Sequence, residues 1–135
     1  MDNPKRERAL GDMANILITG ANGFLGSRLA ATMPVGSTVR LNGRDEMVER
    51  LVLVDHLVTD IAAGPDGAEW VEGDLGAVVA AQPDLISSAD AVFHLASATS
   101  GECEAELDLG INANLLAGVA LGRCLASAAQ RPLLV

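Results

Sequence analysis

The chain has 135 residues, half of them apolar, and its 18 acidic and 9 basic side chains give a formal net charge of −9. This length and apolar content predict one domain with a proper core and exclude a chain that is disordered throughout. The acidic balance disfavours a nucleic acid as partner, since the basic residues gather only at Lys5, Arg6 and Arg8.

Three segments open the chain. Residues 1–13 are mostly polar and predict a disordered N-terminal extension or an upstream start, so the folded domain is expected over residues 14–135. The run NILIT at residues 15–19 is typical of a strand covered on both faces in a parallel sheet. Residues 24–33 predict a helix that stops at Pro34. Its apolar stripe consists of Leu25, Leu29 and Met33.

The middle of the chain alternates between strands and helices. Residues 34–50 are polar and predict a loop with a short irregular piece, and LVLVD at 51–55 predicts a second buried strand. A third, shorter strand is expected around Trp70 and Val71. A helix interrupted near Pro83 is expected within residues 75–88, before a fourth strand that ends near Leu95.

The longest periodic segment, residues 104–129, predicts a helix with three interior glycines, Gly110, Gly118 and Gly122. Each costs about 1 kcal/mol relative to alanine, so we expect close packing against another backbone there. The run LLV at residues 133–135 predicts the start of a fifth strand. Strands that alternate with helices predict an α/β domain with right-handed crossovers.

The remaining composition bears on location. The apolar-rich runs are expected to fall far short of the roughly 20 residues that a membrane span needs, and no signal-peptide core is present. Cys103 and Cys124 belong to no C-x-x-C motif, which predicts reduced thiols and no metal site. We therefore expect a cytoplasmic protein without a membrane partner.

Gly20, Gly23 and Gly26 form the pattern G-x-x-G-x-x-G between the first strand and the first helix. Alone, the pattern is compatible with a nucleotide site or with only a tight turn. In a dinucleotide-binding unit the first glycine permits the turn, the second lets a pyrophosphate approach, and the third lets the helix lie close to the strand. The anion then lies at the helix N-terminus, which adds Phe24 and Leu25 to the candidate cofactor-binding residues.

Asp55 ends the second predicted strand, where a carboxylate can accept hydrogen bonds from the adenosine ribose of NAD. It lies 29 residues beyond Gly26 instead of about 20, a difference that we assign to residues 34–50. A carboxylate there would repel a ribose 2′-phosphate and favour NAD over NADP. The alternative is that Asp55 caps a helix or is a solvated loop residue.

The segments GANGFLG, LVLVD, VEGDL and AVFHLAS precede a helix that contains Asn114. In this order they resemble the extended short-chain dehydrogenase/reductase family, the NAD-dependent epimerase/dehydratase group. SGECEAELDLG at residues 100–110 looks like a segment of the D-erythronate dehydrogenases. The resemblance implies a Rossmann-type doubly wound parallel sheet, truncated here after the start of the fifth strand. It also implies NAD as cofactor, a sugar acid or nucleotide sugar as substrate, and a homodimer for full-length relatives.

The resemblance also assigns roles to single residues. Asp74 and Leu75 match the pair beside the adenine ring, although Asp74 has an equal claim as the cap of the next helix. The turn under the cofactor's ribose and pyrophosphate is matched by Leu95, Ala96 and Ser97. Asn114 matches the helix asparagine that supports the active-site backbone. His94 is expected to be a packed, hydrogen-bonded residue and not a base or a metal ligand.

Catalysis in that family uses a Tyr-x-x-x-Lys pair with a serine or threonine. The sequence has no tyrosine, and its one lysine is Lys5. We therefore expect no catalytic residue in this chain and no activity from it alone. Two functions remain open: the NAD-binding part of a dehydrogenase or epimerase that oxidises a sugar acid such as D-erythronate, and a non-catalytic NAD-binding module for sensing or interaction.

Overall fold

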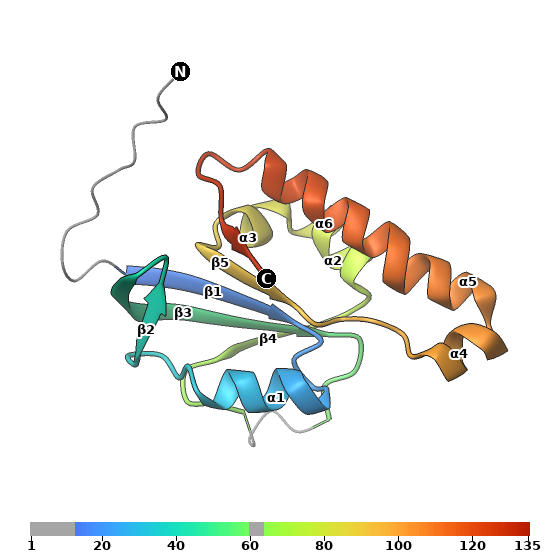
Figure 1. The fold of residues 1–135 in the computed structure, drawn as a ribbon, viewed down its shortest axis with the longest axis horizontal. Helices are drawn as coiled ribbons and strands as arrows, with labels where there is room; N and C mark the ends of the chain where they lie inside the picture. Colours follow the sequence, from blue (N-terminus) through green and yellow to red (C-terminus); the bar gives the residue numbers. More distant parts are fainter. Residues whose placement is uncertain (1–12, 60–63) are drawn as a thin grey trace.

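The computed structural model describes residues 13–59 and 64–135, which form a six-stranded sheet with helices on both faces (Figure 1). The strands are β1 (Met13–Thr19), β2 (Thr38–Leu41), β3 (Arg44–Asp55), β4 (Glu69–Glu72), β5 (Ala91–His94) and β6 (Leu133–Leu134). The helices are α1 (Phe24–Ala31), α2 (Leu75–Ala81), α3 (Pro83–Ser87), α4 (Ser100–Ala105), α5 (Leu107–Gly110), the π-helical η2 (Ile111–Leu116) and α6 (Ala117–Ala126). The extension expected over residues 1–13 lies outside the described residues except for Met13, which begins β1.

Parallel pairs join β4 to β3, β3 to β1, β1 to β5 and β5 to β6. The strand order therefore runs in one direction from β1 to β4 and in the other from β1 to β6. This is the order of a doubly wound dinucleotide-binding sheet, whose first strand is central. The Rossmann-type fold and the parallel pairing of the first four predicted strands, β1, β3, β4 and β5, are confirmed.

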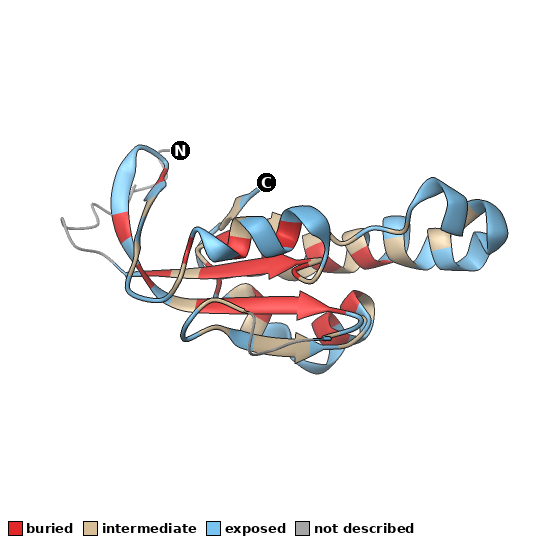
Figure 2. Ribbon diagram, turned by 90° about the horizontal axis from the view of Figure 1, so that it is seen from below, coloured by how far each residue is buried: buried red, intermediate tan, exposed pale blue. Residues whose placement is uncertain are grey.

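Two apolar clusters cover the two faces of the sheet. Successive side chains of a strand point to opposite faces, so Leu17 packs with α2, α3 and α6, while Ile16 and Ile18 pack on the side of α1. All three are at most 1% exposed. Figure 2 shows buried residues concentrated in the central strands. This two-sided burial is why NILIT is apolar without alternation.

The prediction of a loop over residues 34–50 was wrong, because β2 and the first part of β3 form an antiparallel hairpin. Asn42 and Gly43 turn the chain with φ values of 50° and 81°. Two positive φ values are typical of a type I′ hairpin turn. Met47 pairs with both Met13 and Thr38, so β2 lies on the edge of β3 away from β1.

The first helix also differs from its prediction. It ends at Ala31, and Leu25 is 64% exposed, so Leu25 is not part of a buried stripe. The buried positions are Gly26 and Ala30, followed by Met33 beyond the helix. Gly26 and Ala30 lie four residues apart on the buried face of the helix, and the Leu25 side chain faces away from it.

The long helix begins later than predicted. Glu106 has extended backbone angles and separates α4 from a helical run over residues 107–126. The expected close backbone packing at its glycines was wrong for two of them. A Cβ on Gly118 would lie 3.8 Å from His94 Nε2, and one on Gly122 would meet no described atom within 4 Å. Gly110 packs closely, but against the side chain of Cys103.

The expectation that apolar runs fall far short of membrane length was also wrong. Leu107–Ala126 spans 20 residues and is long and apolar enough to cross a membrane by length and composition. One such helix is weak evidence, since the core helix of a globular domain passes the same test. The buried residues of α6, which are Ala117, Leu121 and Leu125, pack against the core of the sheet.

Candidate functional site

The predicted site residues meet at the carboxyl ends of β1, β3 and β5. Gly20 follows the last residue of β1, and Leu95 follows the last residue of β5. The two strands are neighbours, and the strand order reverses at β1. In open α/β sheets ligands bind outside the carboxyl ends of the strands at such a reversal point.

Each glycine of the turn meets a different environment. Gly20 has a φ of +70°, and a Cβ on it would lie 2.7 Å from Ala96 N. A Cβ on Gly26 would overlap the carbonyl oxygen of Gly20. Among described non-neighbouring atoms, a Cβ on Gly23 would meet only the carbonyl oxygen of Gly20, at 3.2 Å. Gly20 and Gly26 are thus required by internal packing, and Gly23 is the least crowded of the three. The Gly23 N–H donates to the Gly20 carbonyl oxygen, and its own carbonyl oxygen accepts from Ser27 N.

Helix α1 begins directly after Gly23. No side chain among the described residues caps its first turn, and the Phe24 and Leu25 side chains are 72% and 64% exposed. The first N–H groups of a helix carry partial positive charge and need acceptors. The Arg28 guanidinium lies 4.5 Å above the Phe24 ring, in the same turn. This helix end is therefore suited to an anion such as a pyrophosphate.

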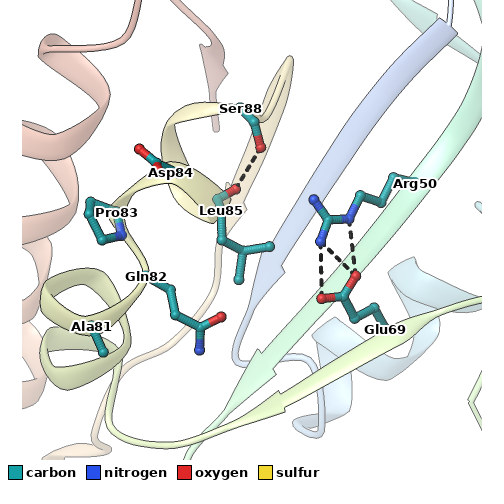
Figure 3. A pocket seen from close by; sticks show the side chains of 8 residues that line it. All are labelled: Arg50, Glu69, Ala81, Gln82, Pro83, Asp84, Leu85 and Ser88. Carbon is teal, nitrogen blue, oxygen red and sulfur yellow. Dashed lines mark hydrogen bonds and ion pairs between the residues drawn. The ribbon is translucent and has the colours of Figure 1, made fainter.

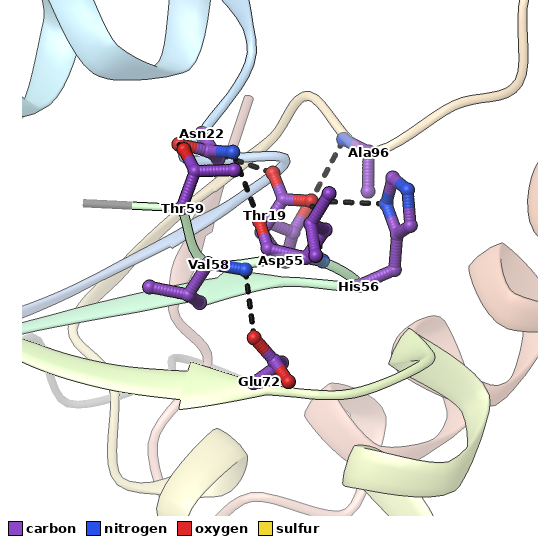
Figure 4. A network of polar contacts seen from close by, with 9 residues as sticks. Thr19, Asn22, Asp55, His56, Val58, Thr59, Glu72 and Ala96 are labelled. Atoms are coloured by element: carbon purple, nitrogen blue, oxygen red, sulfur yellow. Dashed lines mark hydrogen bonds and ion pairs between the residues drawn. The ribbon is translucent and has the colours of Figure 1, made fainter. Parts of the chain in front are cut away.

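The Asp55 carboxylate fastens the end of β3 to the glycine turn (Figure 4). Its Oδ2 accepts a hydrogen bond from Asn22 N at 2.8 Å, and its Oδ1 accepts one from Leu57 N at 3.4 Å. His56 Nδ1 lies 3.0 Å from the same Oδ1. With 8% of Asp55 exposed, the alternative of a solvated loop residue was wrong. Carboxylate oxygens have further acceptor sites, so a ribose hydroxyl remains compatible with these contacts.

Thr19 joins the ends of β1 and β5. Its buried Oγ1 accepts a hydrogen bond from Ala96 N at 3.2 Å and lies 2.7 Å from His94 Nδ1. Leu95 N donates to the Thr19 carbonyl oxygen. Burial lowers the pKa of His94, which favours the neutral ring that accepts the hydroxyl proton at Nδ1. The prediction that His94 is packed and hydrogen-bonded is confirmed. Ser97, the next predicted site residue, is exposed.

Asp74 and Leu75 lie at the start of α2. Asp74 is the N-cap, and its Oδ1 accepts a hydrogen bond from Ala77 N at 3.2 Å. Leu75 is 6% exposed and belongs to the core. The capping role proposed as the alternative for Asp74 is therefore present, and its contact with an adenine ring stays a prediction.

Asn114 lies in the π-helical segment η2 and holds the chain that follows β5. Its Oδ1 accepts from Ala98 N at 2.7 Å, and its Nδ2 donates to the Ala98 carbonyl oxygen at 3.0 Å. The Nδ2 also lies 3.5 Å from Cys103 Sγ. Single π-helical turns are frequent at functional sites. Here the segment turns one amide onto both polar groups of one backbone residue.

The profile of the NAD dependent epimerase/dehydratase family matches residues 16–134. The chain belongs to this family. It is 39% identical over 109 residues to the D-erythronate dehydrogenase of Cupriavidus necator, covering 79% of this chain and 33% of that protein. The matched curated relatives are therefore about three times as long as the matched segment.

Solved structures with the same fold match this chain. The nucleoside-diphosphate-sugar epimerase from Agrobacterium tumefaciens superposes with a TM-score of 0.65 at 29% identity, over 93% of this chain and 36% of that one. The Bordetella bronchiseptica enzyme WbmF, in complex with NAD+, gives a TM-score of 0.67 at 22% identity, over 91% of this chain and 34% of that one. The cofactor of the epimerase/dehydratase family is NAD.

One pocket is lined by residues of α3 and of neighbouring segments. It has a volume of about 530 Å³ and lies between α3 and the strands β3 and β4 (Figure 3). Arg50 of β3 and Glu69 of β4 form a two-pronged ion pair on its strand side, with N–O distances of 2.8 to 3.0 Å. Glu69 begins β4, so the pocket lies toward the amino end of that strand. It contains none of the predicted site residues.

Sequence reasoning missed two polar residues beside Asp55, namely Asn22 and Glu72. The Asn22 side chain contacts Leu57 and Thr59, and Glu72 contacts Val58. Asn22 occupies an unspecified position of the glycine pattern, and Glu72 ends a short strand. No spacing in a single sequence indicates which backbone groups these side chains reach.

Proposed function

We propose that this chain is the NAD-binding part of an NAD-dependent dehydrogenase that oxidises a sugar acid such as D-erythronate. The single observation that carries the cofactor role is the turn of Gly20, Gly23 and Gly26, which places the uncapped N-terminus of α1 directly after the carboxyl end of β1. The identity to D-erythronate dehydrogenase supports the substrate class.

The proposed roles follow from the site. Gly23 and the first turn of α1, with Phe24 and Leu25, hold the pyrophosphate. Asp55 accepts hydrogen bonds from the adenosine ribose, and Asp74 with Leu75 lies beside the adenine. The turn after β5 lies under the ribose and pyrophosphate, and Asn114 holds its continuation at Ala98. Bound NAD would supply the acceptor for a hydride from the substrate.

A titration tests the cofactor role. We expect the 135-residue chain to bind NAD in calorimetry and to prefer it over NADP, because the Asp55 carboxylate repels a 2′-phosphate. Asp55→Ala should lose this preference. Asp45→Ala, in the exposed hairpin where Asp45 pairs with Arg40, is the matched control. Equal affinity of the wild-type chain for NAD and NADP would contradict the role of Asp55.

We further propose that the 135-residue chain alone turns over no sugar acid, since it lacks tyrosine and thus a Tyr-x-x-x-Lys pair. The same absence supports a second candidate, a non-catalytic NAD-binding module for sensing or interaction. Formation of NADH from D-erythronate by this chain would contradict the first statement. The nucleotide sequence beyond the Val135 codon separates the candidates: a frame that encodes a serine and Tyr-x-x-x-Lys supports the dehydrogenase.

Location and assembly are part of the same proposal. Cys103 and Cys124 are free thiols, which agrees with a reducing cytoplasm. The helical run over residues 107–126 exposes Leu107, Leu115 and Leu116. Large exposed apolar surfaces favour association, and we propose a homodimer for the full-length protein.

A further inference from the structure

One peptide group beside Asp55 is held from two sides. The carbonyl oxygen of Leu57 accepts a hydrogen bond from Asn22 Nδ2 at 2.9 Å, and the N–H of Val58 donates to Glu72 Oε2 at 2.8 Å (Figure 4). These two backbone groups belong to the same peptide unit. Asn22 comes from the glycine turn and Glu72 from the end of β4, so two separate elements fix one peptide plane.

Further hydrogen bonds of Asn22 and Asp55 hold the residues around this peptide. The backbone N–H of Asn22 donates to Asp55 Oδ2, and Thr59 Oγ1 donates to Asn22 Oδ1 at 3.3 Å. Leu57 N donates to Asp55 Oδ1. A shift of the Leu57–Val58 peptide would therefore change the surroundings of the Asp55 carboxylate on both of its oxygens.

Apolar burial contributes little to the position of this segment. The side chains of His56 and Leu57 are exposed, with Leu57 at 52%. A segment that buries few apolar contacts depends on its hydrogen bonds for a fixed position. Among the described contacts, those of Asn22 and Glu72 restrain the Leu57–Val58 peptide from two sides.

We propose that Asn22 and Glu72 are positioning residues for NAD, which act through the Leu57–Val58 peptide to keep the Asp55 carboxylate oriented toward the adenosine ribose. This inference rests on the proposed cofactor role of Asp55. It gives a role to Asn22, which occupies an unspecified position of the pattern G-x-x-G-x-x-G, and to Glu72, the last residue of β4. Neither side chain needs to touch the cofactor, because each acts on the backbone of residues 57–58.

The test compares variants by two independent measurements on the 135-residue chain. We call the contacts of Asn22 with Leu57 O and of Glu72 with Val58 N the clamp. Hydrogen exchange of the Val58 amide without NAD reports whether the clamp is present. Calorimetric titration with NAD reports how much the clamp contributes to NAD affinity. The variants are Asn22→Ala, Glu72→Ala, Glu72→Gln and the double alanine variant. Glu49→Ala, at an exposed position of β3, is the control for loss of one surface carboxylate.

We expect each single alanine variant to speed exchange at Val58 and to weaken NAD binding about five-fold, the equivalent of roughly one net hydrogen bond. Glu72→Gln keeps an acceptor oxygen and should stay close to wild type, as should Glu49→Ala. The double variant should lose less than the product of the single losses, because both side chains hold one peptide.

The outcomes separate this inference from the proposed function. Equal Val58 exchange in all variants overturns the clamp, whether or not NAD binds. Faster exchange with unchanged NAD affinity overturns the positioning role but leaves the proposed function in place. If the loss of NAD affinity in the double variant equals the product of the two single losses, the shared action of Asn22 and Glu72 on one peptide is overturned. A wild-type chain that does not bind NAD contradicts the proposed function and the positioning role together, while the exchange rates still decide the clamp.

Discussion

Replacing Gly26 with alanine should destabilise the fold, although alanine favours helices. A Cβ at this position would overlap the Gly20 carbonyl oxygen and lie 2.8 Å from both Gly20 C and Ala21 Cα. All of these are backbone atoms, so no flexible side chain can move aside. The glycine turn and the first turn of α1 would have to separate.

Two effects of opposite sign decide the magnitude. Alanine gains about 1 kcal/mol over glycine in a helix interior. Overpacking a closely packed site costs typically about 1–3 kcal/mol, and contact with rigid backbone belongs at the upper end. We therefore expect Gly26→Ala to lower the free energy of unfolding by about 1–2 kcal/mol after the helix gain is subtracted.

Urea unfolding of wild type and variants measures this difference. Gly122→Ala is the matched control, because it makes the same chemical change in α6, where no described atom lies within 4 Å of the new Cβ apart from its chain neighbours and its own helix backbone. It should raise the free energy of unfolding by up to about 1 kcal/mol. The opposite signs are the core of the prediction. A neutral or stabilising Gly26→Ala would refute the packing argument.

Three further predictions concern other contacts. Thr19→Val should cost about 1–3 kcal/mol in unfolding experiments, because Ala96 N loses its acceptor, and Thr19→Ser should cost less; equal losses would speak against it. Burial lowers the pKa of His94 from 6.5, so its contribution to stability is complete above pH 6.5 and is lost as the pH falls through its lower folded-state pKa. His94→Gln should flatten that part of the pH profile of urea unfolding, and an unchanged slope would count against the assignment. The exposed Leu115, Leu116 and the β6 edge at Leu134 should make the chain associate in light scattering, and a stable monomer would disprove this.

The parallel part of the sheet could be predicted because its signals are local. NILIT and LVLVD are uninterrupted apolar runs, and the glycine pattern follows the first of them directly. A strand that is buried on both faces of a sheet consists almost entirely of apolar residues. The hairpin was missed although Asn42-Gly43, which follows the alternating run TVRL at residues 38–41, is a strong type I′ signal. The polar composition of residues 34–50 led to the prediction of a loop in spite of the Asn42-Gly43 dipeptide.

The contacts around Asp55 could not be predicted in the same way. The position of Glu72 depends on the register of β4 against β3, where Glu72 pairs with Asp55. Asn22 reaches Leu57 only because the glycine turn and the end of β3 meet in space. Such contacts follow from tertiary placement, and a single sequence encodes them without a spacing pattern.

The π-helical segment Ile111–Leu116 determines how the helical run over residues 107–126 would respond to the deletion of one residue. An α-helix advances about 100° per residue, and a π turn holds one residue more than an α turn. Deleting one residue within 111–116 would let an ordinary helix form without a gap. Because the π turn already takes up the extra residue, α5 would stay close to its present orientation relative to α6. The wide turn that brings Asn114 onto Ala98 would be lost, and with it both hydrogen bonds to that residue. A shortened gene product of this kind would keep its helix content and lose the contact between its helix and the loop after β5.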